Sequence, residues 1–251
     1  MGGANISFRN IVKFFEADQR PVLNSVNLEI KASEVICIVG PSGCGKTTLL
    51  NVLAGFEQIS HGACDVDGRA VAGAGPDRGF VFQKPTLYPW MTMWQNVTLG
   101  ARVAGRRERQ YRAGAENLLQ QTGLTDYVRH FPYQISGGMA QRAQLVRVLL
   151  SEPKVMLMDE PFGALDYQTR LSMHRLLMEL HGKHKPTIVF ITHDVDEAVF
   201  LADRVIVMSQ RPGTVIADLK IDLPRPRALH EVATPQFGAY KEEILSLLGF
   251  H

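Results

Sequence analysis

A glycine-rich segment, residues 40–48, has the composition of a phosphate-binding loop. It reads Gly-Pro-Ser-Gly-Cys-Gly-Lys-Thr-Thr and lies between the apolar run 35–39 and the helix-favouring stretch 49–54. Glycines let successive backbone N–H groups turn inward around an anion, and the N-terminus of the following helix adds partial positive charge. Lys46 would then reach the β- and γ-phosphates of a nucleotide, and Thr47 would hold Mg²⁺. The alternative is a glycine-rich surface turn. That interpretation does not explain why a predicted strand precedes the segment and a predicted helix follows it.

Two adjacent carboxylates follow a second apolar run. Residues 155–158, Val-Met-Leu-Met, lead directly into Asp159 and Glu160. Ligands of parallel sheets bind at the carboxyl ends of the strands. Asp159 could therefore hold Mg²⁺ through its water shell, and Glu160 could orient or deprotonate the water that attacks a γ-phosphate. The alternative is that both carboxylates cap the turn at Pro161, but the phosphate loop upstream favours the chemical role.

A serine and two glycines precede another helix and form a third element of the same kind. Ser136, Gly137 and Gly138 begin the predicted helix 137–150, which gives a second helix N-terminus suited to an anion. Alone, this triplet is most often a simple N-cap. Two copies of the chain facing head to tail could, however, enclose a nucleotide from both sides with two-fold symmetry.

The first part of the chain reads as β-structure. Alternation predicts a largely antiparallel segment broken by a polar turn around residues 16–20, and its candidate inward positions are Ile6, Phe8, Val26, Leu28 and Ile30. Residues 62–71 predict a hairpin that turns at Asp67-Gly68, and residues 79–82 predict a buried strand that ends at Gln83.

The rest of the chain alternates between helix and strand after a helical insert. Residues 96–129 are rich in Ala, Leu, Arg, Glu and Gln at helical spacing, as in Tyr111, Ala115, Leu118 and Leu119. Helices at 137–150 and 169–181 then alternate with buried strands at 155–158 and 188–191, which predicts a parallel core sheet. The tail has a proline-rich break at 223–227, followed by a short amphipathic helix from about 238 to 248.

Composition sets broad limits. The chain has 251 residues, and its 27 basic and 25 acidic side chains leave a formal net charge of +2, so no global field favours nucleic acid or anionic lipid. Cys37, Cys44 and Cys64 lack the spacing of a zinc site or disulfide framework, which predicts reduced thiols in a cytoplasmic protein. We find neither a secretory signal nor an apolar run long enough to cross a bilayer, so any membrane span must come from another subunit.

Taken in order, these motifs resemble those of the ATP-binding subunits of ABC transporters, over about residues 6–209. Residues 136–141 match the family's signature, and residues 164–166 match the loop that meets the opposite subunit. His193 matches the histidine near the γ-phosphate, where an imidazole can donate a hydrogen bond to developing charge while staying neutral near pH 7. Phe15 matches the aromatic side chain that stacks on adenine, although the family more often has Tyr there.

The resemblance implies a fold and a set of site residues. The expected fold is α/β: a P-loop NTPase core with a mostly parallel sheet, an N-terminal antiparallel β subdomain and a helical insert subdomain. The chain would form a single ATP-binding domain with its core at about 1–83 and 152–222, its helical subdomain at about 84–151 and a short tail at about 223–251. The expected cofactors are ATP and Mg²⁺. Catalytic roles fall to Glu160, His193, Gln83 and Lys46, metal binding to Thr47, Gln83 and Asp159, and ATP binding to Phe15, Gly40, Pro41, Ser42, Gly43, Cys44, Gly45, Lys46, Thr47, Thr48, Ser136, Gly137, Gly138 and Asp166.

Three segments narrow the resemblance to the nitrate, sulfonate and taurine importer branch: residues 83–90, 161–166 and 223–227. In that branch an ATPase dimer, of the chain with itself or with a homologous subunit, powers two integral membrane permease subunits and acts indirectly on a solute-binding protein. The chain would therefore lie on the cytoplasmic face of the inner membrane, with no nucleic-acid partner. The aromatic stretch of Tyr88, Trp90 and Trp94 lies where the family receives the coupling helix of its membrane partner; alternatively, these side chains pack the insert against the core.

The signature departs from its commonest form at Met139 and Ala140. Met139 resembles a variant frequent among importers, whereas Ala140 removes a basic charge beside the second phosphate site. Three other functions stay open at this point: an ABC exporter, a soluble ABC ATPase that acts on DNA or the ribosome, and a phosphate-loop kinase or GTPase. The last leaves the signature and His193 without a role.

Overall fold

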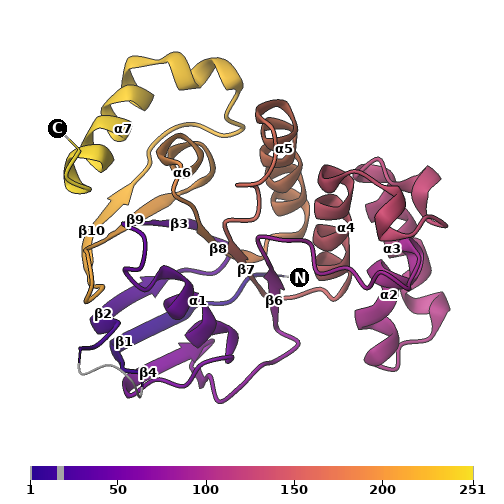
Figure 1. Cartoon of the computed structure of the whole chain (residues 1–251), viewed down its shortest axis with the longest axis horizontal. Coiled ribbons are helices and arrows are strands. Elements are labelled where there is room, and N and C mark those ends of the chain that lie inside the picture. Colours follow the sequence, from indigo (N-terminus) through magenta and orange to yellow (C-terminus); the bar gives the residue numbers. More distant parts are fainter. Residues whose placement is uncertain (1, 16–19, 251) are drawn as a thin grey trace.

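The computed structural model describes residues 2–15 and 20–250, and Figure 1 shows their arrangement. The predicted polar turn at 16–20 falls almost entirely outside these residues. An antiparallel sheet and a larger, mostly parallel sheet form two layers, and the helices α2, α3 and α4 gather on the side away from the antiparallel sheet. The tail helix α7 packs over α6.

The N-terminal β segment forms the antiparallel sheet. Its strands, in the spatial order β2, β1, β4, β5, are β2 (Leu23–Ile30), β1 (Ile6–Lys13), β4 (His61–Val66) and β5 (Arg69–Ala70). The predicted inward positions Ile6, Phe8, Val26, Leu28 and Ile30 are all buried. The predicted hairpin is confirmed, because β4 and β5 pair across Asp67 and Gly68, which have φ angles of 50° and 72°.

The larger sheet carries the predicted parallel core. Its strands, in the spatial order β10, β9, β3, β8, β7, β6, are β10 (Val215–Lys220), β9 (Arg204–Met208), β3 (Val35–Val39), β8 (Thr187–Ile191), β7 (Val155–Asp159) and β6 (Arg78–Val81). All neighbours pair in parallel except β9 and β10, which pair antiparallel. The carboxyl ends of β3, β7 and β8 therefore lie along one edge of the sheet, just before the residues singled out for chemistry.

The prediction of a buried strand at 79–82 was wrong in part. The strand β6 ends at Val81, which is its only buried residue, and Phe82 is 38% exposed. The reason is position, because β6 is the last strand of its sheet and pairs only with β7. The ring of Phe80 lies 4.4 Å from that of Phe82 and 5.4 Å from that of Phe56, so three partly exposed aromatic side chains pack together at this strand.

The helices largely follow the predicted ranges, except for the short helix after His193, which was not predicted. They are α1 (Lys46–Ala54), α2 (Met93–Val103), α3 (Glu108–Gln121), α4 (Gly137–Leu150), α5 (Tyr167–His184), α6 (Val195–Leu201) and α7 (Pro235–Leu247), with short 3₁₀ turns at Thr125–Tyr127, Pro132–Gln134 and Leu229–Ala233. The predicted insert thus resolves into α2, α3 and one 3₁₀ turn, and Tyr111, Ala115, Leu118 and Leu119 are buried as expected.

The four central strands of the larger sheet, β9, β3, β8 and β7, are buried on both faces, because alternate side chains enter two different cores. The first core lies between the two sheets and surrounds α1; the parallel strands contribute Ile36, Ile38, Val155, Leu157, Val189, Ile191, Ile206 and Met208. The second lies on the opposite face beneath the remaining helices; the parallel strands contribute Val35, Cys37, Val39, Met156, Met158, Ile188, Phe190, Val205 and Val207. The sheet edge that carries the candidate site is therefore held rigidly from both sides.

Cys37, Cys44 and Cys64 are free and buried. Burial raises the pKa of the Cys64 thiol to about 12, so this thiol stays protonated and unreactive. Within residues 2–15 and 20–250, no helix combines the length and apolar character that a membrane span requires.

Candidate functional site

The phosphate loop connects the end of β3 to the start of α1. Gly45 is the N-cap of α1 with φ 101°, and Gly43 has φ 77°, both in the left-handed region that favours glycine. Lys46 is 8% exposed, and its Nζ donates hydrogen bonds to Gly40 O at 2.7 Å and Pro41 O at 2.9 Å. The ammonium group thus lies within the loop, where the oxygens of a bound phosphate would compete with these two carbonyls.

Gly213, which is distant in the sequence, packs against the phosphate loop. Gly213 pairs with Leu23 of β2, and a Cβ atom at Gly213 would lie 2.0 Å from the backbone oxygen of Cys44. The backbone between β9 and β10 therefore packs directly against the phosphate loop. Sequence analysis missed this contact, because nothing near Gly213 in the sequence resembles a nucleotide-binding motif.

We predict that Gly213→Ala weakens ATP binding by about 10-fold and destabilises the protein by about 1–3 kcal/mol, since the added methyl group must displace the backbone of the loop. The comparison is Gly182→Ala in α5, where a Cβ meets nothing within 4 Å. Titration with a fluorescent ATP analogue and thermal unfolding measure both effects. Unchanged affinity and melting temperature in Gly213→Ala would contradict the packing argument.

Thr47 and Asp159 meet at the carboxyl edge of the sheet. The Thr47 hydroxyl donates a hydrogen bond to Asp159 Oδ1 at 3.3 Å. Burial, and to a lesser extent the neighbouring Glu160, raise the pKa of the Asp159 carboxyl, while the Thr47 hydrogen bond and Lys46 oppose that rise. A nearby cation would relieve the cost of this buried charge.

This pair fits Mg²⁺. A hydroxyl and a carboxylate are oxygen ligands of the kind that Mg²⁺ prefers, and Mg²⁺ usually takes only one or two from the protein, with waters and substrate phosphates supplying the rest. Among residues 2–15 and 20–250, no group of three or more His, Cys, Asp and Glu side chains could hold a metal by itself. Thr47 and Asp159 would supply two oxygen ligands of Mg²⁺.

Glu160 and His193 meet beside this pair. His193 Nδ1 lies 3.1 Å from Glu160 Oε2, and the side chains are 65% and 27% exposed. Glu160 has φ 44°, a strained backbone for a non-glycine residue, and its N–H donates to Ile191 O at 3.0 Å. The end of β8 therefore fixes the backbone from which the Glu160 carboxylate reaches His193.

Gln83 approaches the same place from β6. A Cβ atom placed on Gly163 would lie 3.7 Å from His193 Cε1 and 4.0 Å from Gln83 Nε2, so both side chains border one small space beside the Glu160 loop. Sequence analysis missed what anchors this segment: on α4, Gln144 Nε2 donates to Phe82 O at 2.9 Å, and its Oε1 accepts from Thr86 N at 2.8 Å. Gln141, which is also buried on α4, donates from Nε2 to the same Phe82 oxygen at 3.4 Å. The sequence signal was two glutamines three residues apart among the apolar residues of the predicted helix 137–150.

The remaining predicted residues do not join this cluster within one chain. Ser136 caps α4 by accepting from Met139 N at 3.3 Å, Gly137 is exposed, and no hydrogen bond among the described residues links 136–138 to the phosphate loop. Asp166 caps α5 by accepting from Thr169 N at 3.1 Å, and the hydrogen bonds from Thr169 lower its pKa. Phe15 is 37% exposed, with Lys13 Nζ 4.8 Å from its ring centroid.

A family model described as ABC transporter matches residues 23–163, which include the phosphate loop, Gln83 and the two carboxylates. The chain belongs to the ABC transporter family. Its fold is accordingly the P-loop core with antiparallel and helical subdomains that the motifs predicted, and its activity class is that of the ABC-type ATPases.

Curated members of the ABC family are similar over nearly the whole chain. A taurine import ATP-binding protein, TauB, of Rhizobium johnstonii is 45% identical over 231 residues, which cover 90% of this chain and 88% of the relative. A nitrate import ATP-binding protein, NrtD, of a Synechocystis species is 44% identical over 232 residues, 90% of this chain and 87% of the relative. An aliphatic sulfonates import ATP-binding protein, SsuB 1, of Pseudomonas fluorescens is 43% identical over 246 residues, 98% of this chain and 87% of the relative.

A solved ABC structure has the same fold. The dimeric post-hydrolysis state of the ATP-binding cassette MJ0796, bound to ADP and Pi, superposes with a TM-score of 0.76 and 30% sequence identity, covering 87% of this chain and 100% of that one.

Proposed function

We propose that this chain is the ATP-hydrolysing subunit of an importer for a small anionic or zwitterionic solute of the sulfonate, taurine or nitrate kind. The observation that carries the proposal is the convergence of Thr47 with Asp159 and of Glu160 with His193 on the sheet edge that bears the phosphate loop. The import names of three relatives support the direction of transport.

Each side chain has a distinct role in the proposed site. Lys46 and the loop N–H groups neutralise the β- and γ-phosphates, and Thr47 and Asp159 hold Mg²⁺, which would offset the charge on the phosphates. Glu160 accepts a proton from the attacking water, while His193 donates a hydrogen bond to the γ-phosphate. Gln83 would help to hold the metal and the attacking water and would link the site to the membrane subunits, and Phe15 would stack on adenine.

In our proposal the site is completed by a second chain. Ser136 and Gly137 lie exposed at the start of α4 and Gly138 is partly buried; the three residues would bind the γ-phosphate of the nucleotide held by the opposite subunit. The dimeric cassette that this chain resembles supports such an arrangement. Two ATP molecules would then hold the dimer closed, and hydrolysis would let it open, so that turnover shifts the population between two dimer states.

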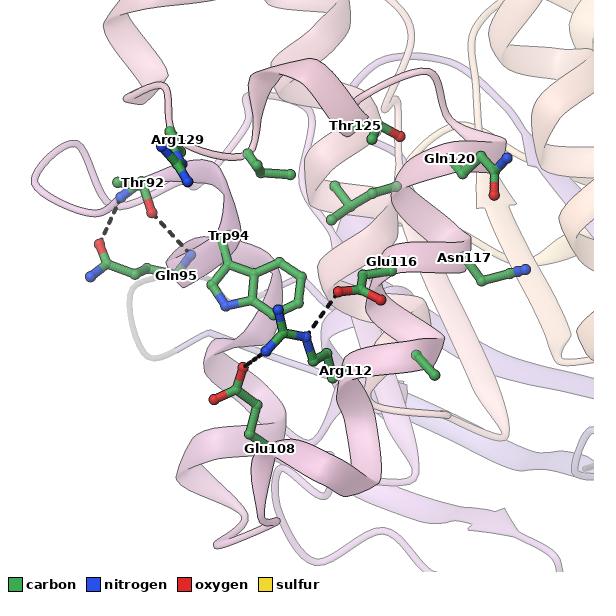
Figure 2. Close-up of a pocket in the computed structure, with 13 residues that line it drawn as sticks. Thr92, Trp94, Gln95, Glu108, Arg112, Glu116, Asn117, Gln120, Thr125 and Arg129 are labelled. Atoms are coloured by element: carbon green, nitrogen blue, oxygen red, sulfur yellow. Dashed lines mark hydrogen bonds and ion pairs between the residues drawn. The ribbon is translucent and has the colours of Figure 1, made fainter.

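The helical subdomain carries the surface that we assign to the membrane subunits. A groove of about 970 Å³ lies between the start of α2, α3 and the segment before α4 (Figure 2). Arg112 lies beside Trp94 in this groove and binds Glu108 at 3.1 Å and Glu116 at 2.9 Å. Near the start of α2, Tyr88 and Trp90 pack 5.3 Å apart, and Trp90 is 69% exposed. An exposed aromatic pair and a partly apolar groove, both near the start of α2, suit a helix from a permease, which would keep the chain at the cytoplasmic face of the inner membrane.

Trp90→Ala should weaken binding of the membrane subunits by about 10- to 100-fold. A tryptophan that becomes buried when two proteins bind is a common anchor of the interface. The ATPase rate of the isolated subunit should not change. Binding of purified subunit to stripped membranes that contain the permease measures the effect, with Phe250→Ala, an equally exposed aromatic in the tail, as the control. Equal binding by the two variants would argue against this surface.

Uptake tests the proposed function as a whole. Cells that lack this gene should fail to accumulate at least one of labelled taurine, an alkanesulfonate or nitrate, and the wild-type gene should restore uptake where Glu160→Gln does not. Undiminished uptake of all three solutes by cells that lack the gene would contradict the proposed transport role, although the chain would still be an ABC ATPase.

A further inference from the structure

Helix α5 carries two side chains, one turn apart, that tie together the loops on either side of the candidate site. Arg170 reaches the loop 160–166 by donating from Nη2 to Leu165 O at 3.1 Å. Its Nη1 donates to Asp194 Oδ2 at 3.2 Å, directly after His193. Arg170 therefore links the loop that contains Glu160 to the loop that contains His193.

His174 makes the same connection one turn further along α5, inside the protein. It is 4% exposed, and its Nε2 donates to Glu197 Oε1 at 2.6 Å. Its ring lies 5.6 Å from the ring of Phe162, which is fully buried in the loop 160–166, and 5.9 Å from that of Phe200 in α6. The imidazole thus packs against Phe162 of the loop 160–166 and hydrogen-bonds α6 through Nε2.

Glu197, the partner of His174, also hydrogen-bonds Thr192 and Asp194, the two neighbours of His193. Its second carboxylate oxygen accepts from the Thr192 hydroxyl, and its backbone N–H donates to Asp194 Oδ1 at 3.1 Å. Asp194 N in turn donates to Thr192 Oγ1 at 3.0 Å. Glu197 therefore holds the residue before His193 through its carboxylate, which is 5% exposed, and the residue after His193 through its backbone N–H.

These bonds matter because His193 has few contacts of its own. Its imidazole is 65% exposed, and within residues 2–15 and 20–250 its hydrogen-bond partner is Glu160, itself a reacting group in the proposed site. The position of the imidazole must therefore be set by its backbone. A buried carboxylate that loses one donor is left unsatisfied, so loss of His174 would loosen Glu197 and, through it, Thr192 and Asp194.

We propose that Arg170 and His174 are positioning residues that couple the His193 loop to the loop 160–166. Neither touches the nucleotide or the reacting atoms. Since residues 164–166, at the end of this loop, are the ones expected to meet the opposite subunit, α5 carries changes at the dimer interface to His193. This inference rests on the roles proposed above for Glu160 and His193.

The test uses His174→Leu and Arg170→Met, each measured for ATP turnover and for binding of a fluorescent ATP analogue. Turnover should fall by about 10-fold or more in both variants, because displacement of a reacting group costs rate, while ATP affinity should stay within about threefold of wild type. His174→Gln keeps a donor to Glu197 and should recover turnover to within about threefold of wild type. The matched control is Arg175→Leu, an exposed arginine of α5 with no hydrogen bond or ion pair among the described residues.

Hydrogen–deuterium exchange separates this proposal from the proposed function. Peptides over 160–166 and 191–197 should exchange faster in His174→Leu and Arg170→Met than in wild type or Arg175→Leu, even without nucleotide. Normal ATP turnover by Glu160→Gln would contradict the catalytic role proposed for Glu160. The exchange rates of the His174→Leu and Arg170→Met variants would still show whether the two loops are coupled. Turnover and exchange equal to those of Arg175→Leu would overturn the coupling. If His174→Leu does not fold, the test rests on Arg170→Met alone. Arg170 is partly exposed, so its replacement should not prevent folding.

Discussion

Glu160→Gln is expected to bind ATP and form a dimer but to turn over about 10²- to 10⁴-fold more slowly than wild type, the usual contribution of a general base. Glutamine keeps the size of the side chain and one acceptor oxygen toward His193. It cannot accept a proton from the attacking water. Because Glu160 is followed by a turn whose backbone bonds do not involve its carboxylate, folding should be unaffected.

Two measurements check this expectation. Phosphate release gives the rate, and light scattering with Mg²⁺ and ATP gives the mass, which should correspond to a dimer that persists because the nucleotide is not hydrolysed. The control is Glu179→Gln, an exposed carboxylate on α5. Wild-type turnover in Glu160→Gln would remove this residue from the catalytic role.

Lys46→Met is expected to lose both nucleotide affinity and turnover. Lys46 is buried at the start of α1, and its ammonium group is the positive charge nearest the loop carbonyls of Gly40 and Pro41. Removing a charged hydrogen-bond donor from a phosphate site should weaken ATP binding by about 10- to 100-fold. Turnover at saturating ATP should fall by about 10²- to 10³-fold, because charge that develops on the phosphates is no longer stabilised.

The measurement is a titration with a fluorescent ATP analogue, followed by turnover at several ATP concentrations. Lys220→Met, in an exposed residue of β10, controls for loss of one positive charge. If Lys46→Met bound the analogue as tightly as this control, the ammonium group would not contact the phosphates.

The sequence allowed those parts of the fold to be predicted whose signals are local. Residues 155–158 and 188–191 read as continuous apolar runs because both faces of these central strands are covered. The helix 137–150 was predicted with the bounds that the structure has, since Ser136 caps its start and Pro153 follows shortly after its end.

Features that depend on distant partners could not be read in the same way. The apolar residues of β6 are typical of a central strand, yet β6 lies at the edge of its sheet. The order of strands in a sheet cannot be predicted from the sequence of one strand. The same limit applies to the support of the site. Gly213 lies beneath the phosphate loop and Glu197 behind His193, and only the tertiary fold brings these residues there.

The central claim is that this ATPase powers a membrane transporter, and co-purification tests it most directly. Tagged chain would be isolated from detergent-solubilised native membranes, and its partners identified by mass spectrometry. We predict recovery of a multi-span permease in similar molar amount, with ATP hydrolysis by the isolated complex. Recovery only outside the membranes, together with ribosomal proteins or nucleic acid, would contradict the account.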